Sequence, residues 1–569
     1  MSQDMSRNNG AHAGSGATEN TAAAAESAAT SAKTANTATA ATTDASLASR
    51  AKQPKKNGPK WWLISLIAVI VAVAVVVGIT FAYAKDDKSD SQTTASASKT
   101  ADTVTIGLKL TPTNLDIRNT AGSALDQVLI GNVYEGLVAR DEKNQVVPAI
   151  ASSWDESKDG LTYTFHLNKN MTFSNGDTLD AEDVAWSINE LIAKQYHDAD
   201  ALAAVSKVEA KDADTVVITL KTPNSNLLWI LTGRAGLVFD KDATYDLKTQ
   251  AIGSGPYTVA KFVENSSITL KANGKYWGDH KAKTPTVVVK YLADDNAAVN
   301  ALKSGDVQVL APITETLAGP FVSDTDNYTV KAGNGTDKFV LAFNNAAGSK
   351  LADKRVRQAI RYAINHEEII ASRGGADKAL GGPIPSLDPG YEDLTGLYPY
   401  DQDKAKSLMA EAGYSADKPL ALTLTYANIY GTELGDQLRS QLKPIGIDLK
   451  VNVVEFSTWL QDVYTNHDFD ISLVDHNESH DFASWADPTY YFGYDNKDVQ
   501  KLYAEGVAAT SDQERDAKFA EAAKLVSEDA PADWLFNYRI TTVTAKGVEG
   551  FPFDLNQTVL PLYNVTYTK

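Results

Sequence analysis

The sequence predicts an α/β protein of several lobes that follows a single membrane-spanning helix. Three observations predict this class. The chain has 569 residues, more than one hydrophobic core usually supports. Strand-like and helix-like patterns alternate from about residue 102 to the end of the chain. Before them, an apolar run of 24 residues carries no charged side chain.

The N-terminal segment, residues 1–60, is expected to stay disordered in the cytoplasm. Of the 30 positions from 21 to 50, 24 are Ala, Ser or Thr. Such a composition offers too little apolar surface to form a core.

Residues 61–84 are predicted to form a transmembrane helix, because about 20 apolar residues are enough to cross a bilayer. Four lysines precede the run within nine positions, which places the N-terminal side in the cytoplasm and the rest outside. Ala82-Tyr83-Ala84 also has the form of a signal-peptidase site, so a cleaved secretory signal is the alternative. Residues 85–101 are interpreted as a polar linker.

Composition excludes several classes of function. The net charge of −19 argues against nucleic-acid binding, which needs a basic face. The absence of cysteine excludes disulfides, thiolate zinc sites, thiol nucleophiles and cysteine-linked lipid anchors. No cofactor is expected.

The elements follow from residue patterns taken in chain order. Residues 161–167 alternate with period two and predict a half-buried strand, and Asp180 is expected to cap the helix after it. Further strands are predicted at 103–108, 216–220, 267–270, 286–290 and 449–454. Residues 353–372 predict one helix, on which Arg355, Arg357 and Arg361 are expected to form a solvated face.

Ten motifs in a fixed order resemble a known family. They include NVYEGLV at 132–138, DGLTYTFHL at 159–167, FSNGD at 173–177, GSGPY at 253–257, RVRQAI at 355–360 and AKSLMAEAGY at 405–414. In this order they resemble extracellular solute-binding protein family 5, the oligopeptide- and dipeptide-binding receptors of ABC importers, in an actinobacterial-like, membrane-anchored form.

The resemblance implies a periplasmic-binding-protein-like α/β fold, with several lobes and a hinge. Lobe I is discontinuous, with expected segments 102–140, 250–335 and 538–569. Lobe II is expected at 141–249 and lobe III at 336–537. Members of the family hold peptides as extended strands in a closing cleft.

The expected ligand site is the segment after the strand that begins at Phe469-Asp470. In peptide-binding relatives this segment carries an acid that pairs with the peptide's amino terminus, but here the usual Trp-and-Asp spacing is not kept. The residues expected to bind the ligand are His476, Asn477, Glu478, Asp481, Trp485 and Tyr490, with Thr111 and Thr113 on the opposite lobe.

Two other interpretations of this segment remain open. His476, Glu478, His480 and Asp481 offer plausible metal ligands, but their spacing is diagnostic of no metal. The segment is also compatible with a structural loop.

The predicted function is the capture subunit of an ABC importer, which closes on a di- or oligopeptide and delivers it to the permease and ATPase subunits. The protein is expected to be a monomer anchored by residues 61–84, with its binding domain outside the cell membrane. An oligosaccharide or another small solute is the alternative ligand. A ligand sensor or a secreted hydrolase is less favoured, and the chain has neither G-x-S-x-G nor H-E-x-x-H.

Overall fold

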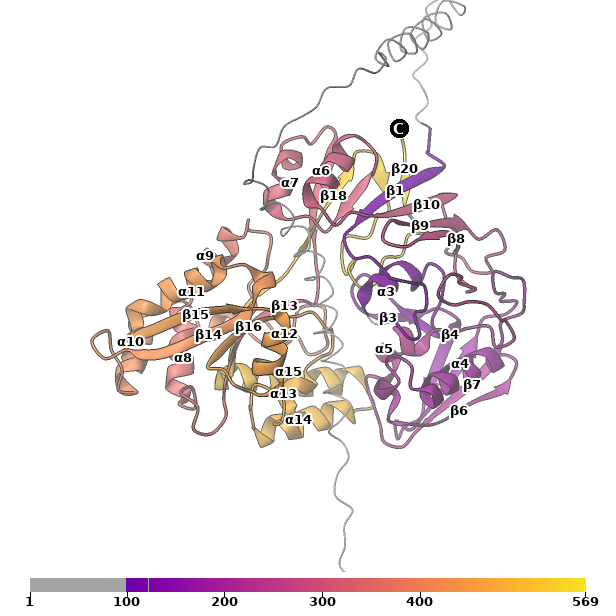
Figure 1. Ribbon diagram of the computed structural model, residues 1–569. Helices are drawn as coiled ribbons and strands as arrows, with labels where there is room; N and C mark the ends of the chain where they lie inside the picture. The colour runs from indigo at the N-terminus through magenta and orange to yellow at the C-terminus, as the bar shows by residue number, and fades with distance from the viewer. Residues whose placement is uncertain (1–98, 121) are drawn as a thin grey trace, which may run out of the picture. The chain divides into compact units, whose positions relative to one another are not determined.

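Three larger β-sheets organise the computed structural model, which describes residues 99–120 and 122–569 (Figure 1). The predicted disordered segment at 1–60, the predicted membrane helix at 61–84 and most of the linker lie outside the described residues. Within the described ranges, no helix combines the length and the apolar character that a membrane crossing requires.

A seven-stranded sheet collects strands from distant parts of the chain, in the order β12-β18-β11-β1-β10-β9-β8. Its central strand, β1, runs parallel to both of its neighbours, β10 and β11. The strands are β1 (Thr103–Leu108), β8 (Tyr257–Val263), β9 (Ser267–Ala272), β10 (Thr286–Tyr291), β11 (Val309–Ala311), β12 (Tyr328–Gly333) and β18 (Ile540–Ala545). The accompanying helices are α3 (Ser123–Leu129), α6 (Asp295–Lys303) and α7 (Glu315–Val322), and a small ribbon pairs β19 (Val548–Glu549) with β20 (Thr566–Tyr567).

A four-stranded antiparallel sheet in the order β4-β5-β7-β6 is built from residues 151–220. Helix α4 packs on it, and the side chain of Asp180 caps this helix as predicted. The elements are β4 (Ala151–Glu156), β5 (Thr162–Leu167), α4 (Ala181–Lys194), β6 (Val205–Asp212), β7 (Thr215–Leu220) and α5 (Leu227–Ile230), preceded by the hairpin of β2 (Val138–Arg140) and β3 (Val146–Pro148).

The third of the larger sheets is five-stranded and mixed, in the order β15-β14-β16-β13-β17. Its strands are β13 (Lys338–Phe343), β14 (Leu420–Ala427), β15 (Ile447–Val454), β16 (Ile471–His476) and β17 (Ala532–Asn537). Its helices are α8 (Lys354–Ala363), α9 (His366–Ser372), α10 (Gln402–Glu411), α11 (Glu433–Leu442), α12 (Phe456–Trp459), α13 (Ala483–Ala486), α14 (Lys497–Val507) and α15 (Asp512–Asp529).

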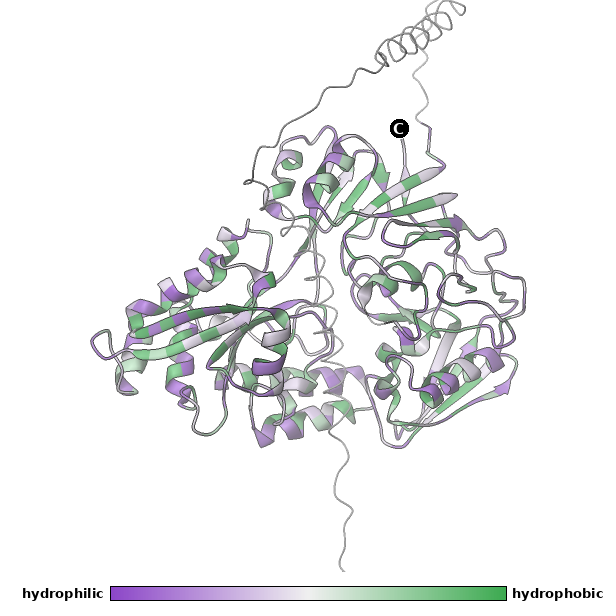
Figure 2. Cartoon of the chain, viewed as in Figure 1, coloured by the Kyte–Doolittle hydropathy of each residue, from purple (hydrophilic) through white to green (hydrophobic). Residues whose placement is uncertain are grey.

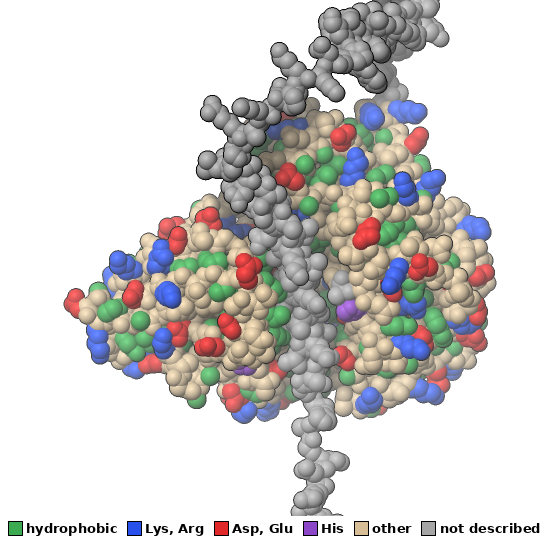
Figure 3. Space-filling model, viewed as in Figure 1, with side chains coloured by type: hydrophobic (Ala, Val, Ile, Leu, Met, Phe, Trp, Pro, Cys, Tyr) green, Lys and Arg blue, Asp and Glu red, His purple; other side chains and the backbone are tan. Residues whose placement is uncertain are grey.

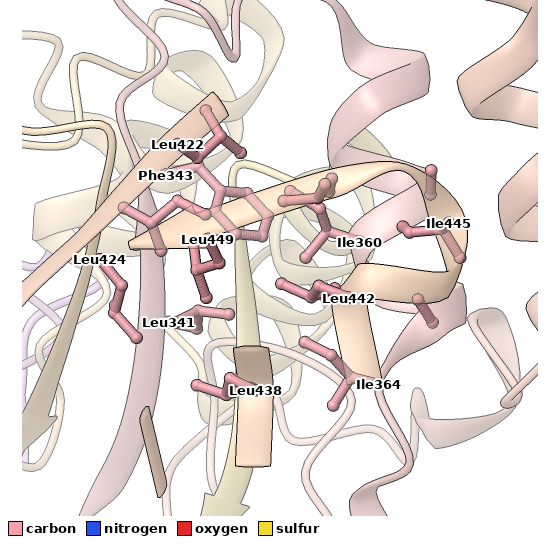
Figure 4. Packing of buried hydrophobic residues seen from close by; sticks show 14 of the residues in the cluster. Leu341, Phe343, Ile360, Ile364, Leu422, Leu424, Leu438, Leu442, Ile445 and Leu449 are labelled. Atoms are coloured by element: carbon pink, nitrogen blue, oxygen red, sulfur yellow. The ribbon is translucent and has the colours of Figure 1, made fainter. Parts of the chain in front are cut away.

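The hydrophobic core of this region lies between the five-stranded sheet and helices α8 and α11. Leu341 and Phe343 of β13 point toward Ile360 of α8 and Leu442 of α11 (Figure 4). Along α10 and α11, hydrophobic residues alternate with hydrophilic ones, as expected for helices with one buried face (Figure 2).

Two neighbouring segments connect the seven-stranded and five-stranded sheets. One runs from β12 to β13 and the other from β17 to β18. They are hydrogen-bonded to each other, since the Tyr538 amide donates to the Asp337 carbonyl at 3.0 Å and the Asn537 side chain donates to Gly335 and Asp337. Two short, paired crossings are the kind of connection about which lobes can rotate.

The GSGPY motif packs against the chain at Asn132–Val133. A Cβ atom on Gly253 would stand 1.9 Å from the Val133 carbonyl oxygen, and one on Gly255 would stand 2.5 Å from that of Asn132. Both glycines are therefore required by a close approach of two backbones.

The helix predicted at 353–372 is wrong in its continuity. The structure breaks it at Ile364–Asn365, because the Asn365 side chain accepts from the Glu368 amide and starts a new helix, α9. A polar residue that can cap a helix interrupts a pattern whose apolar spacing would otherwise continue.

The prediction that the three arginines of α8 form a solvated face is also wrong. Arg361 is buried, with its Nε 3.2 Å from Asp533 Oδ1. Arg357 is buried too and donates to four backbone carbonyls of two neighbouring segments, and only Arg355 is exposed. The partners of the buried arginines lie up to 173 residues away in sequence, beyond the reach of a local pattern.

On the face of the molecule seen in Figure 3, Lys and Arg side chains are interspersed with Asp and Glu. No region of a single charge sign dominates this view.

Candidate functional site

A cavity opens where β16 ends and the polar segment after it begins. It contains about 540 Å³ of space unoccupied by protein atoms, part of it open to solvent. Strand β16 ends here because its buried run Ile471–Val474 gives way to the polar sequence DHNESHD. The lining residues are Tyr430, Phe456, Trp459, Tyr464, Val474, Asp475, His476, Asn477, Glu478, Asp481, Ser484, Tyr490 and Tyr491.

One buried lysine organises the acidic side of this cavity. Lys338, the first residue of β13, is 1% exposed and lies opposite His476 in the sheet register. Its Nζ is 3.2 Å from Asp481 Oδ1, and it donates to the Glu478 carbonyl at 2.7 Å and to the Thr336 carbonyl at 3.1 Å. Lys338 therefore fixes the segment after β16 to one of the two inter-sheet connections.

Two further acids have no such partner. The side chains of Asp475 and Glu478 form no ion pair with any residue in the described ranges, and the buried Oδ1 of Asp475 has no hydrogen-bond partner there. Burial and the nearby Asp481 raise the pKa of Glu478 to about 8. Burial and Asp337 raise the pKa of Asp475 well above its usual range.

The two other titratable groups of the cavity are Asp481, which pairs with Lys338, and His476, which is kept neutral. Burial raises the pKa of Asp481 to about 6, although Lys338 acts in the opposite direction. Burial and the charge of Lys338 lower the pKa of His476 to about 3, so its imidazole is neutral near pH 7.

Aromatic rings form the rest of the wall. The rings of Tyr490 and Tyr491 lie 5.0 Å apart, and that of Tyr464 lies 5.9 Å from Tyr490. The imidazole of His476 stacks on Tyr491 at 6.3 Å, and the Trp459 indole donates to the Ser472 hydroxyl at 2.9 Å. A cavity lined by aromatic rings with a few charged groups is typical of sites for small ligands.

The segment after β16 also contacts the region around the four-stranded sheet. The side chain of Asn144, in the β2–β3 hairpin, donates to Ser479 Oγ at 2.7 Å and to Asp388 Oδ1 at 3.1 Å. The ring of Trp229 stacks on the imidazole of His480, with centroids 4.2 Å apart. The contacts join residues that are more than 200 positions apart in the chain, such as Asn144 with Asp388 and Asn226 with His480.

The structure gathers five of the eight predicted ligand residues in this cavity. They are His476, Asn477, Glu478, Asp481 and Tyr490.

The other three predicted residues lie elsewhere. Trp485 is buried and stacks on Phe492, with ring centroids 4.2 Å apart, and it does not line the cavity. Thr111 and Thr113 follow β1, half-buried and exposed respectively, and neither lines this cavity.

Sequence reasoning missed Lys338, Asp475 and most of the aromatic wall. Asp475 directly follows the predicted strand, so its position after a buried run was a signal that could have identified it. Lys338 is separated from Asp481 by 143 positions and carried no local signal.

The metal-binding interpretation receives no support from the described residues. Across residues 99–569, position 121 excepted, no three His, Asp or Glu side chains are placed to hold a metal ion. His480 stacks on Trp229, and the His476 Nδ1 lies 3.9 Å from Asp481 Oδ2.

Comparison with known proteins gives one family. The sequence profile of the bacterial extracellular solute-binding proteins, family 5 Middle, matches residues 145–499. The chain is 25% identical over 455 residues to the glutathione-binding protein GsiB of Salmonella paratyphi A, covering 76% of this chain and 88% of the relative. A similar protein in Pectobacterium atrosepticum is 25% identical over 458 residues.

Solved structures share the fold. The substrate-binding protein CtaP of an ABC transporter from Listeria monocytogenes superposes with a TM-score of 0.74 at 23% identity, covering 83% of this chain and all of that one. The murein tripeptide-binding protein MppA in its open form gives 0.73 at 23% identity, covering 83% and 99%. The oligopeptide-binding protein AppA of Bacillus subtilis, in complex with a nonapeptide, gives 0.64 at 22%, covering 82% and 99%.

Because the family profile covers more than half of the chain and the fold agrees, the protein belongs to the bacterial extracellular solute-binding proteins of family 5.

Proposed function

We propose that the protein is the substrate-binding subunit of an ABC importer and that it captures di- or oligopeptides in the cavity at the end of β16. Membership of family 5 supports the transport role. The observation that carries the proposal is the cavity itself, with acids, a neutral imidazole and aromatic rings beside two short connections between sheets. His476, Asn477, Glu478, Asp481 and Tyr490 are the proposed ligand contacts. Thr111 and Thr113, after β1, are proposed to contact the ligand from the opposite lobe, and Trp485 is proposed to act through the cavity wall by its stacking on Phe492.

The three larger sheets are proposed to be the bodies of three lobes. Lobe I comprises 102–140, 250–335 and 538–569, lobe II 141–249 and lobe III 336–537. The hinge is proposed at 334–337 and 538–539, where the two connections are hydrogen-bonded. Contacts from Asn144 and Trp229 to the segment after β16 would then form when lobes II and III close.

The work of such a protein is a difference in affinity between open and closed states, so no bond in the ligand is broken. Residues 61–84 are proposed to anchor a monomer at the cell membrane with the binding region outside, as an actinobacterial-like member of the family. Permease and ATPase subunits are the proposed partners. The peptide is proposed to bind and leave unaltered, without a cofactor.

Isothermal titration calorimetry of the full-length protein with a set of di- to pentapeptides tests this proposal. A saturable signal at about one peptide per chain is the expected result. The aromatic wall also suits stacking on sugar rings, so a set of oligosaccharides of similar mass belongs in the same experiment. Binding of the sugars with no binding of any peptide would contradict peptide capture.

A further inference from the structure

The cavity at the end of β16 has a marked excess of acidic groups. Asp475, Glu478 and Asp481 line it. Among the described residues, Lys338 is the one lysine or arginine that forms an ion pair with any of these three acids. The three hydrogen-bond donors of Lys338 are already used by Asp481 and by two backbone carbonyls. Lys338 and Arg373 act on these acids only from a distance, and within the described ranges neither Asp475 nor Glu478 forms an ion pair.

Ionising Asp475 and Glu478 costs free energy when no bound cation faces them. A carboxylate in a partly dry cavity without an ion pair loses part of its hydration, and burial raises the pKa of both acids for this reason. Asp475 has in addition a buried oxygen without any hydrogen-bond partner among the described residues. A buried acceptor of this kind is rare in folded proteins unless a ligand, an ion or water completes it.

The aromatic rings specify what kind of positive group fits. Six aromatic side chains line the same cavity as the two acids, and the rings of Tyr464, Tyr490 and Tyr491 lie within 6 Å of one another. The faces of such rings attract organic cations, most of all a planar guanidinium. Their apolar bodies also suit a methylene stem that ends in a charge.

The wall is poorly suited to a peptide backbone. Asp475 and His476 are paired with β13, and the Asp475 amide donates to the Tyr430 hydroxyl at 3.1 Å. The carbonyl of Glu478 is taken by Lys338. With these backbone groups occupied, side chains supply most of the remaining contacts, so a side chain is the part of a peptide that fits here.

We propose, on the basis of the proposed peptide-binding function, that this cavity is a specificity pocket for the cationic side chain of a lysyl or arginyl residue. The side chain would enter between the aromatic rings and place its charge against Asp475 and Glu478. The protein is then a receptor with a preference for basic peptides.

Matched peptides test this inference in the full-length protein. Calorimetry compares Ala-Arg-Ala with Ala-citrulline-Ala, because citrulline keeps the shape of arginine without its charge. The arginine peptide is expected to bind at least about tenfold more tightly, which corresponds to one well-placed charged hydrogen bond. Acetylation of the amino terminus of both peptides is expected to leave this ratio unchanged, since the charge that is recognised belongs to the side chain.

Variants locate the effect. Asp475→Asn and Glu478→Gln keep the shape of each side chain and remove its ability to ionise beside a bound cation, so each is expected to lower the arginine-to-citrulline ratio several-fold. Asp468→Asn, an exposed acid just before β16, is the matched control and is expected to keep the wild-type ratio. Neither cavity substitution strands a charged partner, and circular dichroism checks that each variant is folded.

Three results would overturn the inference: a ratio near one in the wild type, a ratio that survives in both cavity variants, or a ratio that disappears when the amino terminus is acetylated. Equal binding of both peptides would contradict the cationic pocket and leave the proposed peptide capture standing. Failure of every peptide to bind would contradict both the proposed peptide capture and the pocket.

Discussion

At the scale of single residues, the acids of the cavity make the stability of the folded protein depend on pH. The pKa of Glu478 is raised to about 8 by burial and by Asp481, and Asp198 acts in the same direction while Lys338 opposes it. A carboxyl whose pKa is raised on folding binds more protons in the folded than in the unfolded state. Stability therefore falls as pH rises from the unfolded pKa near 4.5 to the folded pKa near 8.

Glu478→Gln is accordingly expected to stabilise the ligand-free protein at pH 8.5 by about 1–3 kcal/mol, because it removes a buried, unpaired charge. At pH 4 the variant and the wild type should unfold alike, since Glu478 is then protonated in both states. Urea denaturation at the two pH values measures the difference. A Glu478→Gln variant that is less stable than the wild type at pH 8.5 would show that the side chain has a favourable partner.

Lys338 provides a second test at this scale. Lys338→Met leaves Asp481 buried without its ion pair and is expected to reduce the free energy of unfolding by about 3–5 kcal/mol. Lys350→Met is the matched control, because Lys350 is half exposed and its pair with the partly exposed Asp470 is worth about 0–1 kcal/mol. Urea denaturation at pH 7 measures both. Equal losses in the two variants would contradict the organising role of Lys338.

At the scale of secondary-structure elements, α8 and α9 are held to the five-stranded sheet by charge as well as by apolar packing. Arg361 of α8 and His366 of α9 both bond to Asp533 of β17, which is fully buried. Burial acts to raise the pKa of Asp533, but His366 and Arg361 bring it below its usual range. The carboxylate thus contributes stability that is present above the unfolded pKa near 3.8 and is lost as pH falls through its folded pKa.

Asp533→Asn is therefore expected to cost about 3–5 kcal/mol at pH 7, since it leaves Arg361 buried without a counter-charge. The cost should shrink as pH falls through the folded pKa of Asp533, because the wild-type carboxyl then also becomes neutral. Thermal unfolding between pH 7 and pH 2 follows the change. A cost that is the same at pH 7 and pH 2 would mean that the loss comes from packing and not from charge.

The elements also show what a sequence can and cannot predict. Strands such as β1 and β5 were predicted to within a residue, because alternation and apolar runs are local patterns. The burial of Arg361 was not predicted, because Asp533 and the carbonyl of Gly381 meet its guanidinium only through tertiary packing. The break between α8 and α9 was missed for a different reason: Asn365 is a local capping signal, but the apolar spacing continues across it.

The same distinction applies to the site. The polar segment after β16 was found because it follows a buried strand, and five of its predicted residues share one cavity. Lys338 could not be found, since its relation to Asp481 depends on the register of β13 with β16.

At the scale of the whole molecule, the segment after β16 joins the ligand cavity to the residues around the four-stranded sheet. Asn144 and Trp229 contact Ser479, Asp388 and His480 without lining the cavity. In the proposed closure of lobes II and III, such contacts favour the closed state, and they are expected to raise ligand affinity by slowing release.

Asn144→Ala and Trp229→Ala are each expected to increase the rate of peptide release about 5- to 30-fold, which corresponds to roughly 1–2 kcal/mol, while the association rate changes little. Surface plasmon resonance with immobilised protein measures both rates. Asn189→Ala, which removes a hydrogen bond to the Val208 carbonyl between α4 and β6, is the matched control. Unchanged release rates in both test variants would contradict a role for these contacts in holding the ligand.

The central claim is that this protein binds a peptide in the cavity at the end of β16 and releases it unaltered. Its most direct test is titration of the full-length protein with a basic tripeptide, followed by mass spectrometry of the peptide recovered after denaturation. One peptide bound per chain and a recovered mass identical to the starting mass are predicted. A peptide that fails to bind, or that returns cleaved or modified, would contradict the account.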